Sequence, residues 1–253
     1  MLNLRNTIWA FIIVLAITIA LDYIMPVSAW IYAGIVLLFA LLLAWGSRSI
    51  KLNFYLKSHI HGDRSKKAVS ITFDDGPDGQ VTPLILDVLK EYNVKAAFFV
   101  VGNKAAMNPD MIKRMDKEGH VIGGHSYSHH FLFDLFSSSL MCKEMQKTDD
   151  LVFSVIGKRL KIFRPPYGVT NPPLARAIKR MHYDSIGWSI KSNDTVLENA
   201  TEICRRILPR LRNGDIILMH DTKPWSVNVL ESLIAHLRNN NFEIHRVDKL
   251  LNI

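Results

Sequence analysis

Two adjacent carboxylates, Asp74 and Asp75, stand at the end of an apolar run and are followed directly by a Gly-Pro turn. Neighbouring carboxylates repel each other, and a cation held by one of them would relieve the repulsion and leave the other free as a base. The same residues also suit an ordinary Asp-Gly-Pro turn with capping carboxylates. Taken alone, this motif favours a structural role over a catalytic one.

Two histidines, His125 and His129, lie four residues apart in a polar segment that follows a pair of glycines. One helical turn would bring both imidazoles to the same face, within reach of a single cation. With a carboxylate from the first motif, they would form a two-His, one-carboxylate site that leaves positions open for water and substrate. Either histidine alone would be an ordinary packed or surface residue, and His130 is expected to point elsewhere.

Two further polar motifs follow apolar runs. In the first, Pro165 and Pro166 fix an extended loop beside Arg164, and a rigid loop can hold an N–H at the fixed point that oxyanion stabilisation requires. In the second, His220 ends the apolar run 216–219 and could act as a general acid near neutral pH. Taken singly, the first would be a plain loop and the histidine a structural residue.

The elements that must position these motifs can be read from the periodicity of apolar residues. Seven strands are predicted, at residues 68–73, 96–101, 120–123, 162–164, 185–190, 216–219 and 242–245. Six amphipathic helices are predicted, at residues 81–92, 109–118, 140–156, 172–181, 199–211 and 226–239. This alternation favours a mostly parallel sheet, open or closed into a barrel, with the polar motifs gathered at the carboxyl ends of its strands.

The composition excludes several classes of protein. The chain has 253 residues, of which 49% are hydrophobic and 21% charged, and this rules out a disordered chain and a disulfide scaffold. No Gly-rich dinucleotide turn or Walker loop occurs in the sequence, and we expect no nucleic-acid partner. Cys142 and Cys204 fall in predicted helices, where we expect packed thiols rather than a disulfide or a metal pair.

The N-terminal segment is apolar, and Asp22 is the only charged residue between Asn6 and Ser47. A Met-Pro pair divides it into two stretches, residues 7–25 and 27–45, each close to the roughly 20 residues that a membrane helix needs. We therefore expect an uncleaved transmembrane hairpin. A secretory signal is the alternative, although a second apolar stretch would then remain in the mature protein.

The predicted organisation is a membrane anchor, a juxtamembrane linker and one larger domain, at residues 1–52, 53–66 and 67–253. Basic residues flank the hairpin at both ends and are absent from its short connection, so the positive-inside rule places the larger domain in the cytoplasm. A single spanning segment would instead export it. The chain carries a formal charge of +8, of which +6 lies outside residues 1–52. A domain of that charge is compatible with a position next to an anionic surface.

Together, in this order, the four motifs resemble those of the polysaccharide deacetylase family, a group of carbohydrate esterases that includes chitin, chito-oligosaccharide and peptidoglycan N-acetylglucosamine deacetylases. The resemblance covers about residues 67–253. Four short motifs in the right order are far less likely by chance than any one of them. The resemblance implies an α/β fold, a distorted (β/α) barrel of about seven strands, in place of an open sheet.

The resemblance also implies a metal site and a general base. Asp75, His125 and His129 match the metal ligands, most often for Zn²⁺, with Co²⁺, Ni²⁺ and Mn²⁺ as alternatives. Asp74 matches the general base that activates the attacking water, and Arg164 matches the arginine that orients this base.

The remaining implied roles concern the leaving group and the acetyl pocket. His220 matches the general acid that protonates the departing amine, Asp194 matches its acidic partner, and the backbone N–H of Tyr167 matches the donor that helps to hold the oxyanion. The implied substrate pocket is formed by Leu218, Pro165, Pro166 and Trp188.

One motif departs from the family pattern. The family commonly has an aspartate where Lys191 stands and a tryptophan where Thr195 stands, whereas Asp194 is retained. We therefore expect catalysis to be intact and the acetyl pocket to differ. Lys191 is expected to be a solvated side chain, with contact to an anionic group of the substrate as the alternative.

The combined expectation is a membrane-anchored, metal-dependent deacetylase acting on N-acetylated amino sugars of a glycan or a lipid-linked saccharide. Its partners would be that substrate and the bilayer. Removal of an O-acetyl group is the alternative within enzymes. An inactive, membrane-tethered carbohydrate-binding protein is the rival from another class, and it would predict a damaged ligand set or a missing base, neither of which the sequence has.

Overall fold

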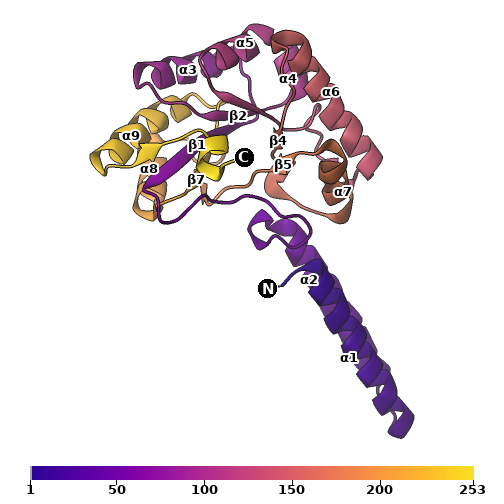
Figure 1. The fold of residues 1–253 in the computed structure, drawn as a ribbon. Coiled ribbons are helices and arrows are strands. Elements are labelled where there is room, and N and C mark those ends of the chain that lie inside the picture. The colour runs from indigo at the N-terminus through magenta and orange to yellow at the C-terminus, as the bar shows by residue number, and fades with distance from the viewer. Residues whose placement is uncertain (1) are drawn as a thin grey trace.

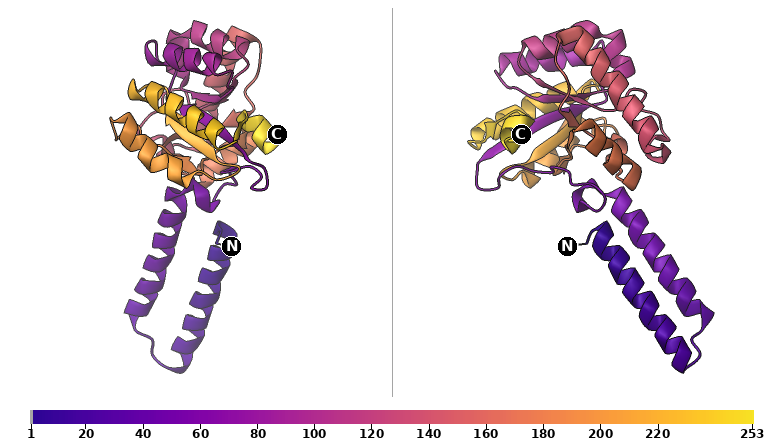
Figure 2. Two further views of the ribbon diagram at one scale, coloured as in Figure 1. Left: turned by 90° about the vertical axis from the view of Figure 1, so that its left-hand side faces the viewer. Right: turned by 45° about the vertical axis from the view of Figure 1, so that its right-hand side comes forward.

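The computed structural model describes residues 2–253 as a helical hairpin and an α/β domain (Figure 1). Met1, the first residue of the expected anchor, lies outside the described residues. The hairpin helices, α1 (Leu4–Ile24) and α2 (Ala29–Arg48), run side by side and extend away from the domain (Figure 2). Both are long and apolar enough to cross a membrane, judged by length and composition. The turn between them includes the predicted Met-Pro break.

Local hydrogen bonds stabilise both ends of α1. At its start the side chain of Asn3 accepts from the backbone N–H of Asn6 at 2.9 Å. At the turn, Asp22 accepts from the backbone N–H of Val27 at 2.7 Å and from the hydroxyl of Tyr32 at 3.1 Å. Asp22, the single charged side chain of the apolar segment, therefore lies at a helix end. Its polar partners and solvent there reduce the free-energy cost of a carboxylate in an apolar segment.

Seven parallel strands form the main sheet in the order β5, β4, β3, β2, β1, β7, β6, and β8 pairs with the start of β1. The strands are β1 (Ala68–Asp74), β2 (Ala97–Val100), β3 (Val121–Gly124), β4 (Ile162–Phe163), β5 (Asp184–Ser185), β6 (Ile190–Lys191), β7 (Ile216–His220) and β8 (Glu243–Ile244). The sheet curls into a half-barrel, which confirms the expected α/β fold class. Every residue of β1 is buried, because it lies in the middle of the sheet.

One predicted strand, residues 185–190, is in fact two. β5 pairs with β4 at one edge of the sheet, whereas β6 pairs with β7 at the other edge. The residues between them cross from edge to edge and hold the curled sheet together. Periodicity could not separate the two strands, because each is only two residues long and therefore too short to show an alternation of its own.

Helices surround the sheet, and the six predicted ones are all present. The α-helices of the domain are α3 (Val81–Glu91), α4 (Gly102–Met107), α5 (Pro109–Lys117), α6 (Ser138–Ile156), α7 (Pro172–Met181), α8 (Ala200–Ile207), α9 (Trp225–Asn239) and α10 (Val247–Leu251). Short 3₁₀ turns occur at Ile50–Leu52, Phe133–Leu135, Pro166–Gly168 and Leu208–Arg210. Sequence periodicity missed α4 and α10, which are too short to show a repeat.

The segment between hairpin and barrel packs against the edge-crossing chain. His59 donates its backbone N–H to the carbonyl of Ser185 at 2.8 Å and accepts from the N–H of Gly187 at 2.9 Å. The hydroxyls of Ser58 and Ser185 lie 2.8 Å apart. Ile50 is buried, and its side chain lies against Gly187. We call residues 50–61 the seam segment, because they close the gap between β5 and β6.

The end of α2 is also bound to the domain. Thr170 donates its N–H to the carbonyl of Ser47 at 3.0 Å, and the hydroxyl of Ser47 donates to the carbonyl of Thr170 at 2.7 Å. The ammonium of Lys51 donates to the carbonyl of Ser189 at 2.7 Å. The hairpin is thus joined to the domain by hydrogen bonds as well as by the covalent chain. The two free thiols, Cys142 and Cys204, lie in α6 and α8, as expected.

Candidate active site

The four polar motifs converge at the carboxyl ends of neighbouring strands. Asp74, the last residue of β1, is in register with His220, the last residue of β7. His125 follows β3 directly, and Arg164 follows β4. The cavity at this end measures about 220 Å³. It is lined by Asp74, Asp75, His125, His129, Pro165, Tyr167, Gly168, Trp188, Lys191, Thr195, Leu218 and His220.

A larger cavity of about 330 Å³ lies at the opposite ends of the strands. Its lining includes Val121 at the start of β3 and Ile162 at the start of β4, together with several charged side chains. It contains none of the residues that the motifs singled out. In a barrel of parallel strands, catalytic residues come from the carboxyl ends, so the smaller cavity is the candidate active site.

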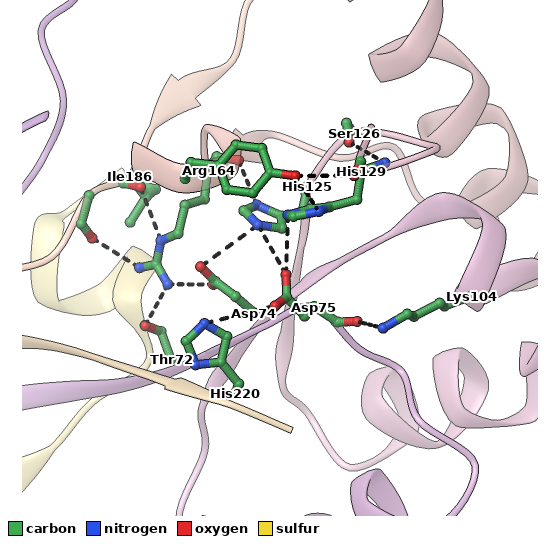
Figure 3. Close-up of polar contacts among 12 residues, drawn as sticks. Thr72, Asp74, Asp75, Lys104, His125, Ser126, His129, Arg164, Ile186 and His220 are labelled. Carbon is green, nitrogen blue, oxygen red and sulfur yellow. Dashed lines mark hydrogen bonds and ion pairs between the residues drawn. The ribbon is translucent and has the colours of Figure 1, made fainter. Parts of the chain in front are cut away.

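Arg164 holds Asp74 in a fixed position. Its Nη1 donates to Oδ1 of Asp74 at 2.7 Å and to the hydroxyl of Thr72 at 2.8 Å. Its Nε donates to the carbonyl of Ile186 at 3.2 Å, and its Nη2 donates to the carbonyl of Gly187 at 2.9 Å. The guanidinium is fully buried, so it gives Asp74 a charged partner that solvent does not screen (Figure 3).

Asp75 faces both histidines of the second motif (Figure 3). Its Oδ1 lies 3.5 Å from Nε2 of His125 and 3.3 Å from Nε2 of His129, and the three candidate ligand atoms lie within 4.8 Å of one another. Burial would raise the pKa of Asp75, but hydrogen bonding and the charge of His125, with the charges of His220 and His129, hold it below its ordinary value. The carboxylate is therefore ionised and available to a cation.

The orientation of each imidazole is set by its Nδ1 atom. Nδ1 of His125 lies 2.8 Å from the carbonyl oxygen of Arg164, which can only accept, so Nδ1 carries a proton and Nε2 is the ring nitrogen that faces Asp75. Nδ1 of His129 lies 3.3 Å from the hydroxyl of Tyr167. Burial and the nearby His125 lower the pKa of His129, which favours its neutral, ligating form.

The expectation of a helical turn between His125 and His129 is wrong. The segment is a loop with left-handed backbone at Ser126 (φ 62°) and His129 (φ 47°). Ser126 accepts the backbone N–H of His129 at 3.0 Å. Glu144 accepts from both the N–H and the hydroxyl of Ser128 at 2.8 Å. With these contacts the centroids of the two imidazole rings lie 5.0 Å apart, and sequence spacing alone gave no signal for the contacts.

The backbone at Asp75 adopts a left-handed conformation with φ 71°, which is uncommon for a residue with a side chain. The carbonyl of Asp75 accepts the ammonium of Lys104 at 2.8 Å, and the next carbonyl, that of Gly76, accepts the N–H of Val101 at 2.8 Å. These bonds hold the turn so that Asp74 and Asp75 point into the same cavity. Sequence reasoning did not single out Lys104 as a contributor.

His220 is paired with a fully buried carboxylate. Nδ1 of His220 lies 2.6 Å from Oδ1 of Asp194, and its Nε2 lies 3.9 Å from Asp75. Burial disfavours the imidazolium, but the hydrogen bond and charge of Asp194 outweigh it and raise the pKa of His220. The hydroxyls of Ser192 and Ser226 donate to Asp194 at 2.7 and 2.9 Å, and neither serine was anticipated from the sequence.

The wall of the cavity combines expected and unexpected residues. Leu218, Pro165 and Trp188 line it, whereas Pro166 is buried and is not among the lining residues. Lys191 also lines the cavity, is exposed, and carries its ammonium 5.9 Å from the ring of Trp188. Thr195, the other position expected to depart from the family pattern, is exposed and lines the same cavity.

Comparison with known proteins identifies the family. The model of the polysaccharide deacetylase family matches residues 61–186. The peptidoglycan N-acetylglucosamine deacetylase PgdA of Listeria monocytogenes is 35% identical over 187 residues, which are 74% of this chain and 39% of that protein. A peptidoglycan N-acetylglucosamine deacetylase of Bacillus cereus is 32% identical over 204 residues, 77% of this chain and 74% of that protein. This chain belongs to the polysaccharide deacetylase family.

The solved structures agree with this assignment. The peptidoglycan deacetylase PdaC of Bacillus subtilis has a TM-score of 0.69 and is 32% identical, with 74% of this chain and 91% of that chain covered. The present chain spans about two fifths of the length of the Listeria relative. The family match begins at residue 61, so most of the seam segment lies before the region that the family model describes.

Proposed function

We propose that this protein is a membrane-anchored, metal-dependent deacetylase that hydrolyses the N-acetyl group of an amino sugar in a glycan or a lipid-linked saccharide. The observation that carries the proposal is the convergence of a carboxylate pair, two histidines and a His–Asp pair on one cavity. The relatives support the class of reaction, since their names specify deacetylation of peptidoglycan amino sugars.

The donor set fits a divalent cation. Asp75, His125 and His129 would hold it, and two imidazoles with one carboxylate suit Zn²⁺, with Co²⁺, Ni²⁺ and Mn²⁺ as alternatives. When bound, such an ion lowers the pKa of water and stabilises negative charge on the acetyl oxygen. The bond between Nδ1 of His125 and the carbonyl of Arg164 supports the assignment, because metal-bound histidines commonly use their second nitrogen in this way.

Side chains of the protein would handle the protons of the reaction. Asp74, held by Arg164, takes a proton from the water that attacks the acetyl carbon. His220 then gives its proton to the amine nitrogen as the C–N bond breaks, so that acetate and the free amine leave. Asp194 orients His220 and raises its pKa, which keeps the acid protonated near neutral pH. The N–H of Tyr167 would donate to the developing oxyanion.

The hairpin would hold this site at a membrane. Arg5 precedes the first apolar stretch, and Arg48 and Lys51 follow the second, so the positive-inside rule favours cytoplasmic ends. A cytoplasmic site would meet no mature wall polymer, and a lipid-linked amino sugar would then be the substrate. Reporters fused after Ile253 test this topology. Alkaline phosphatase activity would show export, whereas fluorescence of a cytoplasmic reporter would support the proposed side.

The function is tested by metal analysis and acetate release on the full-length protein. We expect about one divalent ion per chain, and acetate from N-acetylated oligosaccharides or lipid-linked N-acetylamino sugars. Metal-loaded protein that releases no acetate from any of these would overturn the proposal. Release from O-acetylated sugars alone would identify an esterase instead.

A further inference from the structure

A loop beside the candidate active site exposes several large apolar side chains. In residues 130–136, which we call the Phe131 loop, Phe131 is 74% exposed, Leu135 79% and Leu132 41%. Phe133, in the middle of the same loop, is fully buried and fixes the loop to the domain. Single exposed apolar residues are ordinary, but three within five positions on an anchored loop indicate a surface that contacts something apolar.

The Phe131 loop is joined to the end of the hairpin by a short series of hydrogen bonds. The side-chain amide of Asn171 donates to the carbonyl of Asp134 at 2.6 Å. The preceding residue, Thr170, exchanges two hydrogen bonds with Ser47 near the end of α2. In Figure 1 and in the right view of Figure 2, α7, which starts at Pro172, lies at the end of the domain from which the hairpin extends.

The end of α2 has the residues of a membrane interface. Trp45 is half-exposed, and Arg48 is the last residue of the helix. Tryptophan and arginine at this spacing mark the level at which a spanning helix reaches the headgroups. Because Ser47 lies between them and binds Thr170, the adjoining Phe131 loop lies near that level.

The charge of the neighbouring helix suits the same surface. Arg176, Lys179 and Arg180 are exposed on α7, and this helix has no acidic side chain. Exposed aromatic and aliphatic residues next to basic ones are the pattern of segments that lie in the interfacial layer of a bilayer with anionic lipids. A glycan partner would not account for the basic helix or for the connection to α2.

We propose that the Phe131 loop inserts into the interfacial layer of the membrane beside the hairpin and, with α7, forms a second membrane contact. The loop begins directly after His129, whose ring lies next to Tyr167 at the cavity wall. Insertion would therefore turn the mouth of the cavity toward the lipid surface and favour substrates carried by a lipid. This inference rests on the proposed function in one respect, namely that the hairpin spans the membrane.

Insertion is tested directly with the full-length protein in vesicles of phosphatidylethanolamine and phosphatidylglycerol. A polarity-sensitive dye is attached at Leu135→Cys, in a background where both native cysteines are alanine. The matched control is Leu84→Cys, which is 49% exposed on α3 at the far end of the domain. Nitroxide-labelled lipids should quench the dye at position 135 and not at 84. No quenching at 135, or equal quenching at both, would overturn the proposal.

A kinetic comparison tests the consequence for the substrate. The double variant Phe131→Ser and Leu135→Ser should raise KM for a lipid-linked N-acetylamino sugar roughly tenfold. It should leave kcat/KM for a soluble chito-oligosaccharide unchanged, and Leu84→Ser should change neither. An equal loss on the soluble substrate would show that the loop binds glycan, and no loss on either would also overturn the inference. Absence of activity in the parent protein would overturn the proposed function and not the insertion of the loop, because the quenching experiment does not depend on turnover.

Discussion

Nη1 of Arg164 lies 2.7 Å from Oδ1 of Asp74, and the same guanidinium is bound to two backbone carbonyls, those of Ile186 and Gly187. The candidate base is therefore fixed to the chain that crosses between the two edges of the sheet. A lysine cannot reproduce this fork of donors.

Arg164→Lys should consequently lower both activity and stability. We expect kcat to fall by about a hundredfold or more as Asp74 loses its fixed position. The free energy of unfolding should fall by about 2–4 kcal/mol, because buried carbonyls lose their donors. Acetate-release kinetics and denaturant unfolding measure the two effects. A near-normal kcat in this variant would show that Arg164 is not needed to position the base.

Metal analysis should distinguish variants of the candidate base from variants of the candidate metal ligands. Asp74→Asn should retain its metal and lose about 10²–10⁴ in turnover, because only the proton acceptor is removed. His129→Ala should lose metal and activity together. Glu118→Gln, away from the cavity, serves as a control for both measurements. Full metal occupancy in His129→Ala would show that His129 is not a ligand.

The pH dependence of activity should depend on Asp194. Because Asp194 raises the pKa of His220, the protonated acid persists above the ordinary histidine value of about 6.5, and activity declines only at higher pH. Asp194→Asn removes the negative charge and should shift the alkaline limb of kcat to lower pH. An unchanged limb in a variant that remains folded would assign that limb to a different group.

His120 should make the fold sensitive to acid. Burial, with the charge of Lys95, lowers the pKa of His120 to about 4, and its Nδ1 accepts the backbone N–H of Ala96 at 3.1 Å. The folded state favours the neutral imidazole, whereas the unfolded chain takes up a proton near about pH 6.5. The contribution of His120 to the free energy of unfolding is therefore complete above about pH 6.5 and is lost as the pH falls toward 4. His120→Asn, which keeps an acceptor, should reduce this loss, which is at most about 3 kcal/mol. Unfolding curves at several pH values measure it, and identical pH profiles would contradict the assignment.

Shortening the chain should show where the folded domain begins. A chain that starts at Ser49 keeps the seam segment and should fold and bind metal. A chain that starts at Gly62 loses the pairing of His59 with Ser185 and Gly187 and the burial of Ile50, and it should unfold at a markedly lower temperature. Equal melting temperatures for the two chains would mean that the seam segment contributes nothing to stability.

The sequence allowed prediction of most of the strands and helices, because their apolar periodicity is local. It also brought Asp74, Asp75, His125 and His220 into one site through the order of their motifs. It failed at 185–190, where two very short strands belong to opposite edges, and at the histidine loop, where Glu144 acts from a distant helix. The contacts of Glu144 with Ser128 and of Ser226 with Asp194 join different elements of the fold, and apolar periodicity carries no information about them.

The backbone of Gly187 makes hydrogen bonds to both the seam segment and the candidate active site. Its N–H donates to His59 in the seam segment, and its carbonyl accepts from the arginine that holds the candidate base. The N-terminal hairpin with its seam segment and the α/β domain are therefore not interchangeable parts, although they are separate in shape. Replacing the hairpin with an unrelated segment would preserve the α/β domain only if the junction were placed before Ile50. A junction further downstream would remove contacts of the seam segment with Gly187, whose carbonyl binds the arginine that holds Asp74.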